Sequence, residues 1–179
     1  MRAGFEPAYT LSARIFHWVT AILVLSMIPF GIIMLQIGSG PTQNLLFNLH
    51  RSIGVILLPI VVCRLIWRLK YPPLPLPDDI PMFQRGAAHA THWALYLLLI
   101  VQPILGWIGT SAYRAPIGVF WLFDLPPIWP ENRTFSDRVF DVHQVIGLAM
   151  AALICAHIGA ALFHHFIQRD RVLMRMVSG

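Results

Sequence analysis

Four long apolar runs constrain this sequence more than any other feature. They cover residues 15–35, 50–69, 91–111 and 139–167, and a membrane-spanning helix needs about 20 mostly apolar residues. Such runs form helices because a bilayer offers no water to satisfy backbone polar groups. The connections between them are short, so the sequence predicts a single domain over residues 1–179. The expected fold is all-α, a membrane four-helix bundle with antiparallel neighbours.

The composition excludes several classes of protein. Hydrophobic residues make up 57% of the chain and charged residues 12%, against roughly 25% charged residues in soluble domains. The mean hydropathy is +0.66. These values exclude a soluble enzyme, a disordered chain and a nucleic-acid-binding domain. The two cysteines, Cys63 and Cys155, form no zinc-binding or covalent haem-attachment motif. The expected surroundings are a lipid bilayer, with no nucleic acid as a partner.

The basic residues predict the orientation. Nine of them lie in the N-terminal segment, the loop after the second run and the C-terminal tail, and four lie on the other side. This asymmetry puts both termini in the cytoplasm. The outer loop before the fourth run contains Trp121 and Trp129, which suit a membrane interface. The inner set is Arg2, Arg14, Arg64, Arg68, Lys70, Arg85, Arg169, Arg171 and Arg175; the outer set is Arg51, Arg114, Arg133 and Arg138.

Four of the eight histidines fall at matched depths in these runs. His17 lies at the inner end of the first run and His50 at the outer end of the second. His143 lies near the outer end of the fourth run, and His157 follows 14 residues later. In a helix, this spacing rises about 21 Å and falls only some 40° short of four full turns. The two therefore share one face, and depth pairs His17 with His157 and His50 with His143.

A binding site explains this set better than packing does. A single intramembrane histidine often serves only as an interhelical hydrogen-bonding group, but four at matched depths indicate a function. Zinc usually takes four protein ligands, or three and a water, and Asp141 is the only Asp or Glu near these depths. Haem needs one or two axial ligands and apolar walls. Paired imidazoles in an apolar bundle therefore favour haem.

Residues around the pairs could complete such sites. Gly54, Gly147 and Gly159 would let a flat macrocycle lie against a helix, although close helix packing explains glycines equally well. Haem propionates bind cations. The candidates for them are Arg51 at the outer site and Arg14 or Arg64 at the inner one, with a snorkelling flank residue as the alternative for Arg64.

The remaining histidines lie at the cytoplasmic interface. They are either interfacial polar residues or donors in a quinone pocket, since histidine can donate to a quinone carbonyl near neutral pH. His164 lies two turns after His157 on the same face and is the first candidate. His89 and His92 are further candidates, and His165 is the fourth member of this group.

The ordered motifs of the chain resemble the bacterial cytochrome b561 family over nearly its whole length. They include Arg14-Ile-Phe-His17-Trp18, His50-Arg-Ser-Ile-Gly54 and Gln102-Pro-Ile-Leu-Gly106. The same pattern continues in Arg64-Leu-Ile-Trp-Arg68-Leu-Lys70-Tyr-Pro72, His89-x-x-His92-x-x-x-Tyr96, His143, His157 and His164-His165.

The resemblance implies a small inner-membrane cytochrome with two haems b per chain. His17 and His157 would ligate the iron of the inner haem, and His50 and His143 that of the outer haem. A superoxide oxidase of this type passes electrons from superoxide outside to ubiquinone near the inner haem. Asp78 and Asp79 stand where the superoxide oxidase pattern has a basic residue, so no quinone contact is carried over to that loop.

Two other functions compete with this one. The chain could be a cytochrome b anchor subunit that relays electrons for a partner dehydrogenase or another periplasmic redox protein. It could also be a histidine-based carrier of divalent metals, but such a carrier prefers carboxylates at the membrane midplane, and this sequence has none there. The first interpretation remains transmembrane electron transfer between the periplasmic face and the quinone pool.

Overall fold

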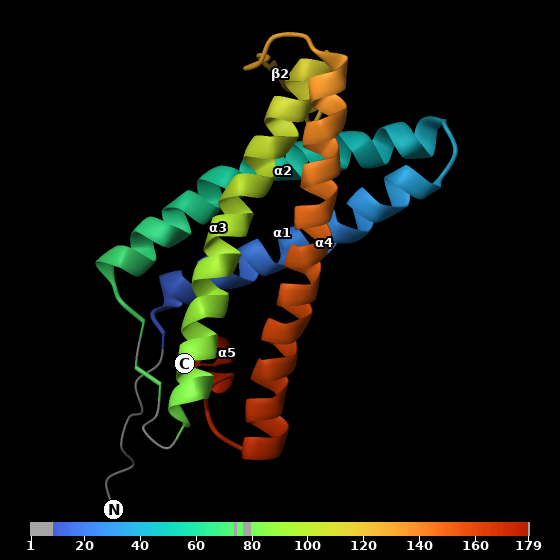
Figure 1. The fold of residues 1–179 in the computed structure, drawn as a ribbon. Helices are drawn as coiled ribbons and strands as arrows, with labels where there is room; N and C mark the ends of the chain where they lie inside the picture. The colour runs from blue at the N-terminus through green and yellow to red at the C-terminus, as the bar shows by residue number, and fades with distance from the viewer. Residues whose placement is uncertain (1–8, 74, 77–79, 179) are drawn as a thin grey trace, which may run out of the picture.

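The computed structural model describes residues 9–73, 75–76 and 80–178. Asp78 and Asp79 lie outside the described residues. Within this part of the chain, the long helices are α1 (Leu11–Gln36), α2 (Pro41–Lys70), α3 (Met82–Tyr113) and α4 (Arg133–Phe163). Each is long and apolar enough to cross a membrane, and neighbours along the chain run in opposite directions (Figure 1). The predicted all-α bundle of membrane-spanning helices is confirmed.

The long helices begin before the predicted spans, and polar side chains cap two of these helix starts. The Thr10 hydroxyl accepts from the backbone N–H of Ala13 at the start of α1, and Asn132 accepts from Phe135 at the start of α4. Such N-caps satisfy backbone donors that have no partner inside the helix. Helix α3 ends at Arg114, which adopts a left-handed conformation with φ of 64°.

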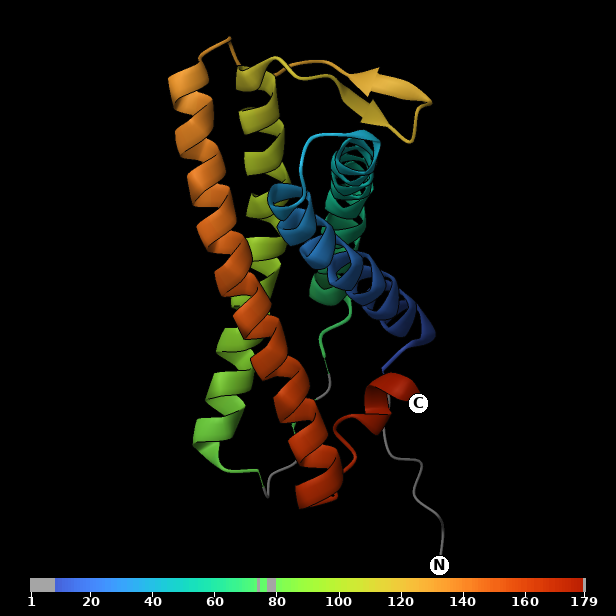
Figure 2. The same cartoon turned by 90° about the vertical axis from the view of Figure 1, so that its right-hand side faces the viewer.

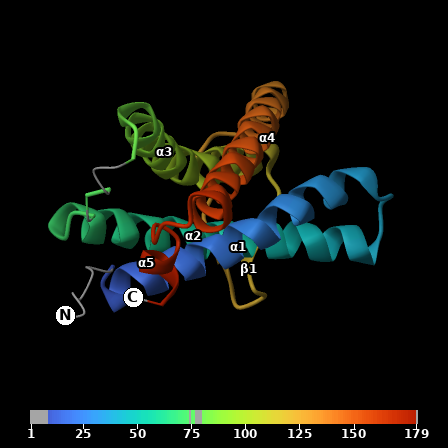
Figure 3. The same cartoon turned by 90° about the horizontal axis from the view of Figure 1, so that it is seen from below.

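The four helices form two hairpins that cross. Helix α1 packs mainly along α2, and α3 along α4. The α1–α2 hairpin lies obliquely across the α3–α4 hairpin, as the views from the side and from below show (Figures 1 and 3). The crossing brings α2 against α3.

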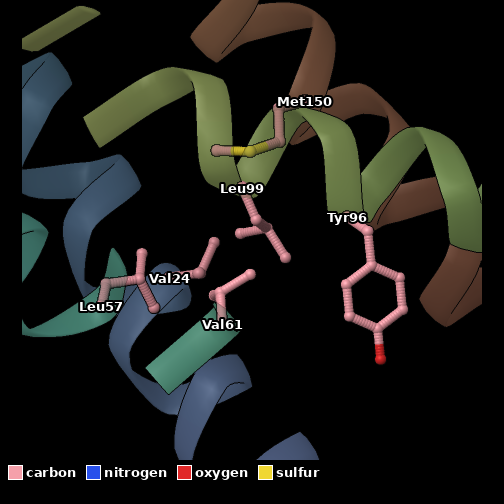
Figure 4. Close-up of a cluster of buried hydrophobic side chains, with 6 residues drawn as sticks. All are labelled: Val24, Leu57, Val61, Tyr96, Leu99 and Met150. Atoms are coloured by element: carbon pink, nitrogen blue, oxygen red, sulfur yellow. The ribbon is translucent and has the colours of Figure 1, made fainter. Parts of the chain in front are cut away.

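A small apolar core fills the crossing (Figure 4). Its members come from all four long helices: Val24, Leu57, Val61, Tyr96, Leu99 and Met150. Met150 lies seven residues from His143 and seven from His157, a rise of about 10 Å in each direction. The core therefore separates the outer histidines from the inner ones.

A β-hairpin packs against α2 beside Arg51 and Ser52. Strands β1 (Ile117–Val119) and β2 (Phe123–Leu125) pair antiparallel, and the hairpin extends sideways from the outer end of α3 (Figure 2). The Ser52 hydroxyl accepts from the backbone N–H of Phe120 at 2.8 Å and donates to the Gly118 carbonyl at 3.2 Å. Arg51 donates to the Pro116 carbonyl at 2.6 Å.

The tip of this hairpin is apolar and exposed. Phe120 and Trp121 both have positive φ, 47° and 60°, the backbone conformation of a tight hairpin turn. The exposed fractions of Trp121, Leu122 and Phe123 are 66%, 80% and 56%. This position suits the membrane interface expected for Trp121. The sequence did not predict the strands, because the turn contains no glycine or asparagine.

The C-terminal segment folds back over the inner end of the bundle. After α4, a single π-helical stretch, η1 (His164–Gln168), leads to a short helix, α5 (Met174–Val177). Arg14 donates to the Val177 carbonyl at 2.8 Å, and the Trp18 indole donates to that of Met176 at 3.1 Å. The Tyr9 backbone N–H donates to the Arg175 carbonyl. The first and last described segments therefore lie together at the inner end, as the predicted topology requires.

Replacing Ser52 by alanine tests how the hairpin is held. The change removes the buried Ser52 hydroxyl that accepts from the Phe120 N–H, so we expect a loss of about 1–2 kcal/mol and a loosened hairpin. Faster hydrogen exchange over residues 117–125 measures this effect. Ser26→Ala is the control, because the Ser26 hydroxyl bonds only within its own helix, to Ile22. Equal exchange in both variants would contradict the assignment.

Candidate functional site

His50 of α2 and His143 of α4 face each other in the outer half of the bundle. Their ring centres are 6.2 Å apart and their planes are inclined by 77°. The Nδ1 atom of His50 lies 3.1 Å from the Met27 carbonyl of α1. His143 has a buried Nδ1 atom with no partner among the described residues. The backbone therefore fixes one ring of this outer pair, and the other ring keeps an unused polar atom.

Two glycines leave room for the outer pair. A Cβ atom on Gly31 of α1 would lie 3.1 Å from the His50 ring, and one on Gly106 of α3 would lie 3.6 Å from the His143 ring. A larger side chain at Gly31 would therefore require the His50 ring to shift slightly. Neither glycine can be assigned this role from sequence, because nothing in the local sequence indicates which helix a histidine will touch.

Gln102 of α3 ties that helix to α4 beside His143. Its Nε2 atom donates to the His143 carbonyl at 3.0 Å, while its buried Oε1 atom has no partner in the part of the chain described. A Cβ atom on Gly147 would lie 2.9 Å from Gln102 Nε2. Gly147 therefore makes space for an amide rather than for a macrocycle, a role that its local sequence does not indicate.

His17 of α1 and His157 of α4 form the inner pair. Their ring centres are 6.4 Å apart, with planes inclined by 63°. His92 of α3 also lies close, with its ring centre 5.3 Å from that of His157. The structure thus brings together the two histidines that depth had paired and adds a third beside them.

One of the three candidate arginines lies against a histidine pair. The Arg64 guanidinium is 2.8 Å from His17 Nδ1 and lies over the Tyr96 ring at 5.1 Å. Arg51 instead donates to the carbonyls of Phe47 and Pro116, and Arg14 to that of Val177. The structure uses these two cations to hold the segments that cover the bundle ends.

The three candidate quinone histidines occupy different surroundings. His89 accepts from the Trp93 indole of its own helix at 3.1 Å, and His92 belongs to the inner cluster. His164 is paired with Asp170, its Nδ1 lying 2.5 Å from Oδ2. Asp170 was not among the residues expected at the site. The contact between Asp170 and His164 depends on a chain reversal that the local sequence does not indicate.

The other two glycines chosen from the sequence have looser surroundings. A Cβ atom on Gly54 would meet the Met27 side chain at 3.4 Å, an ordinary contact, and one on Gly159 would meet nothing within 4 Å. Among the described residues, no group of three or more His, Cys, Asp or Glu side chains could hold a metal ion. Neither pair therefore extends into the ligand set of a zinc site.

Comparisons with known proteins identify the family. The model of the prokaryotic cytochrome b561 family matches residues 8–179. The chain belongs to this family. It is 36% identical over 172 residues to cytochrome b561 homolog 2 of Escherichia coli strain K12, which covers 95% of this chain and 91% of that protein.

Two further relatives cover almost the same region. Cytochrome b561 homolog 1 of the same organism is 31% identical over 165 residues, or 90% of this chain and 92% of that protein. A probable superoxide oxidase CybB of Yersinia pestis is 31% identical over 164 residues, or 90% of each chain. The chain is thus a multi-pass bacterial membrane protein of electron transfer, and its family implies a b-type haem.

The histidine pairs of this cytochrome b561 family member fit such a group. Two imidazoles that bind one metal ion from opposite sides have ring centres about 6 Å apart, because each metal–nitrogen bond is about 2 Å long. The observed separations are 6.2 and 6.4 Å.

Replacing Gly147 by alanine tests the packing beside the outer pair. The added Cβ displaces the Gln102 amide from the His143 carbonyl, and the loss of this hydrogen bond should cost about 1 kcal/mol. Thermal unfolding in detergent measures the change. Gly86→Ala is the control, because a Cβ there meets nothing within 4 Å. A Gly147→Ala variant as stable as Gly86→Ala would show that Gln102 is free to move.

Proposed function

We propose that this chain carries two b-type haems and moves electrons across the bacterial inner membrane. His17 and His157 are the proposed axial ligands of the inner haem, and His50 and His143 those of the outer haem. The observation that carries the proposal is the pair geometry: two facing imidazole pairs, 6.2 and 6.4 Å between ring centres. Helix α4 supplies one histidine to each pair, His143 and His157, which are 14 residues apart.

Bound haem supplies one-electron transfer at each pair, and the chain determines where this happens. The carbonyl of Met27 can accept a proton from His50 Nδ1, which leaves Nε2 as the free ligand atom. The apolar core around Met150 lies between the pairs and keeps water out of the interval.

Arg64 is the proposed partner of an inner haem propionate. An imidazole bound through Nε2 carries its proton on Nδ1 and no longer accepts there. Ligation by His17 would therefore release the Arg64 guanidinium, now 2.8 Å from that atom, for a carboxylate. Arg14 and Arg51 are weaker candidates, because both already donate to backbone carbonyls.

Superoxide is the proposed donor, and ubiquinone the proposed acceptor. Two superoxide ions each lose one electron to become O₂, and one quinone takes up two electrons and two protons. The relative described as a probable superoxide oxidase supports this donor. His164 supports a quinone site at the inner end, because its ring is oriented by Asp170 and only 13% of its side chain is exposed. His92 and His89 are secondary candidates.

A second candidate function is an electron relay for a partner dehydrogenase. The exposed tip of the outer hairpin, Trp121, Leu122 and Phe123, favours it, because exposed apolar patches often mark interaction sites. A redox protein that copurifies with the chain and reduces it would support this alternative over superoxide.

Single histidine variants test the ligand assignment. His143→Ala should lose the outer haem and keep the inner one, and His157→Ala should do the reverse, because each variant removes one ligand of one pair. The haem content per chain and the reduced-minus-oxidised spectrum measure the result, with about two haems expected in the unaltered protein. His165→Ala should keep both. Full haem content in both ligand variants would overturn the assignment.

The donor is tested on the purified protein in detergent. Superoxide should reduce the haem absorbance bands, and a short-chain ubiquinone should reoxidise them. Superoxide dismutase is the control. It should abolish the reduction by superoxide and leave the reoxidation of already reduced protein by ubiquinone unchanged. A protein that takes no electrons from superoxide but is reduced by a copurifying partner would replace this donor with the relay function.

A further inference from the structure

The end of α4 places a carboxylate against the proposed quinone histidine. The helix widens into η1 and ends at Arg169, which has a φ of 55°. The Asp170 backbone N–H then donates back to the His164 carbonyl at 3.2 Å. This reversal brings the side chain of Asp170 to the ring of His164. In a continued α-helix, residues six apart lie on different faces, so the contact exists only because the helix stops here.

The pair is fixed from both sides and shielded from water. Asp170 Oδ2 lies 2.5 Å from His164 Nδ1, and Oδ1 accepts from the Val172 backbone N–H at 2.9 Å. The exposed fractions of the two side chains are 13% and 16%. Gln168 of η1 also donates to Gln84 of α3 at 3.4 Å, which ties this turn to the start of α3. The carboxylate therefore has a defined orientation.

We propose that Asp170 is a positioning residue that makes His164 the proton donor to the quinone. This inference rests on the proposed quinone site. A neutral imidazole that donates through Nδ1 can only accept at Nε2, and a quinone carbonyl also only accepts. The Asp170 carboxylate holds the proton on Nδ1 and stabilises the imidazolium that forms when Nε2 takes up a proton from water at the inner face. The Nε2 atom, which faces away from the pair, can then pass this proton to the quinone.

The proton and electron balance is simple. Reduction of one quinone to a quinol consumes two electrons, supplied by bound haem, and two protons. For each proton, the Nε2–H bond of His164 breaks as an O–H bond forms on a quinone oxygen. His164 then regains a proton from water at the inner face.

Among the described residues, the other candidate histidines have no carboxylate partner. His165 packs its ring edge-to-face on Phe166. His89 is bonded to an indole, and His92 lies against His157. Within the described ranges, His164 is the candidate histidine that pairs with a carboxylate. This contrast separates His164 from its neighbours as the proton donor.

The test follows a single oxidation of the prereduced protein. Full-length protein with reduced haems is mixed with a short-chain ubiquinone, and the loss of the reduced haem band is recorded at increasing quinone concentration. Asp170→Asn keeps an oxygen that can accept from Nδ1 and removes only the charge. We expect the limiting rate to fall about 100-fold, the usual scale of a lost general acid, with little change in the half-saturating quinone concentration.

Companion variants separate charge from packing. Asp170→Glu retains the charge and should recover part of the rate. His164→Gln should be as slow as Asp170→Asn, and the double variant no slower, because the two residues act as one unit. His165→Gln is the matched control and should react at the unaltered rate. Haem content and spectrum should be unchanged in all of them.

Two results would overturn the inference in distinguishable ways. A fast Asp170→Asn beside a slow His164→Gln would refute the role of Asp170 and leave the quinone site in place. Fast reaction in every variant, with haem retained, would refute the quinone site at His164 itself. A rise in the half-saturating quinone concentration alone in Asp170→Asn would show that Asp170 acts on quinone binding and refute its role in proton donation.

Discussion

Helix α4 contributes one histidine to each pair, and the rest of the molecule is arranged around this one element. His143 and His157 are separated by four nearly complete turns, so both rings leave the same face. The partner of His143 comes from α2 and that of His157 from α1. Both partner histidines therefore belong to the α1–α2 hairpin. Because this hairpin crosses α4 obliquely, α4 meets the histidine of α2 at the outer depth and the histidine of α1 at the inner depth (Figure 3). Met150, halfway between the pairs, marks the apolar contact at which the hairpins meet.

At both ends of the bundle, polar side chains of the long helices bond to backbone carbonyls of the segments that cover them. Backbone groups of non-helical segments near a membrane need partners, because lipid supplies none. At the outer end Arg51 and Ser52 bond to carbonyls of the β-hairpin. At the inner end Arg14 and Trp18 bond to carbonyls of α5. Arg14 and Arg51, which by sequence alone are also candidates to bind an anionic ligand, thus hold the covering segments in place. Of the three candidate arginines, Arg64 lies beside a histidine pair.

Much of this could be predicted from sequence because its causes are local or periodic. Long apolar runs specify spanning helices wherever they occur, and helical periodicity places His143 and His157 on one face. The β-hairpin could not be predicted, because Phe120 and Trp121 are not residues that favour positive φ. Their turn is held by a hydroxyl on α2, distant in sequence. The glycines show the same division: Gly147 was recognised as important, but the amide that needs its space lies on another helix.

The sequence by itself determined the number of spanning helices, their alternation across the membrane and the depth of each histidine, because hydrophobicity and helical rise are properties of the chain alone. Only the tertiary structure decided which side chains meet. Arg64 reaches His17, Gln102 reaches the His143 backbone, and Asp170 returns to His164. The first two contacts join different helices, and the third depends on where a helix stops. Such contacts are set by how helices cross and end, and these features depend on packing between distant segments that no local pattern encodes.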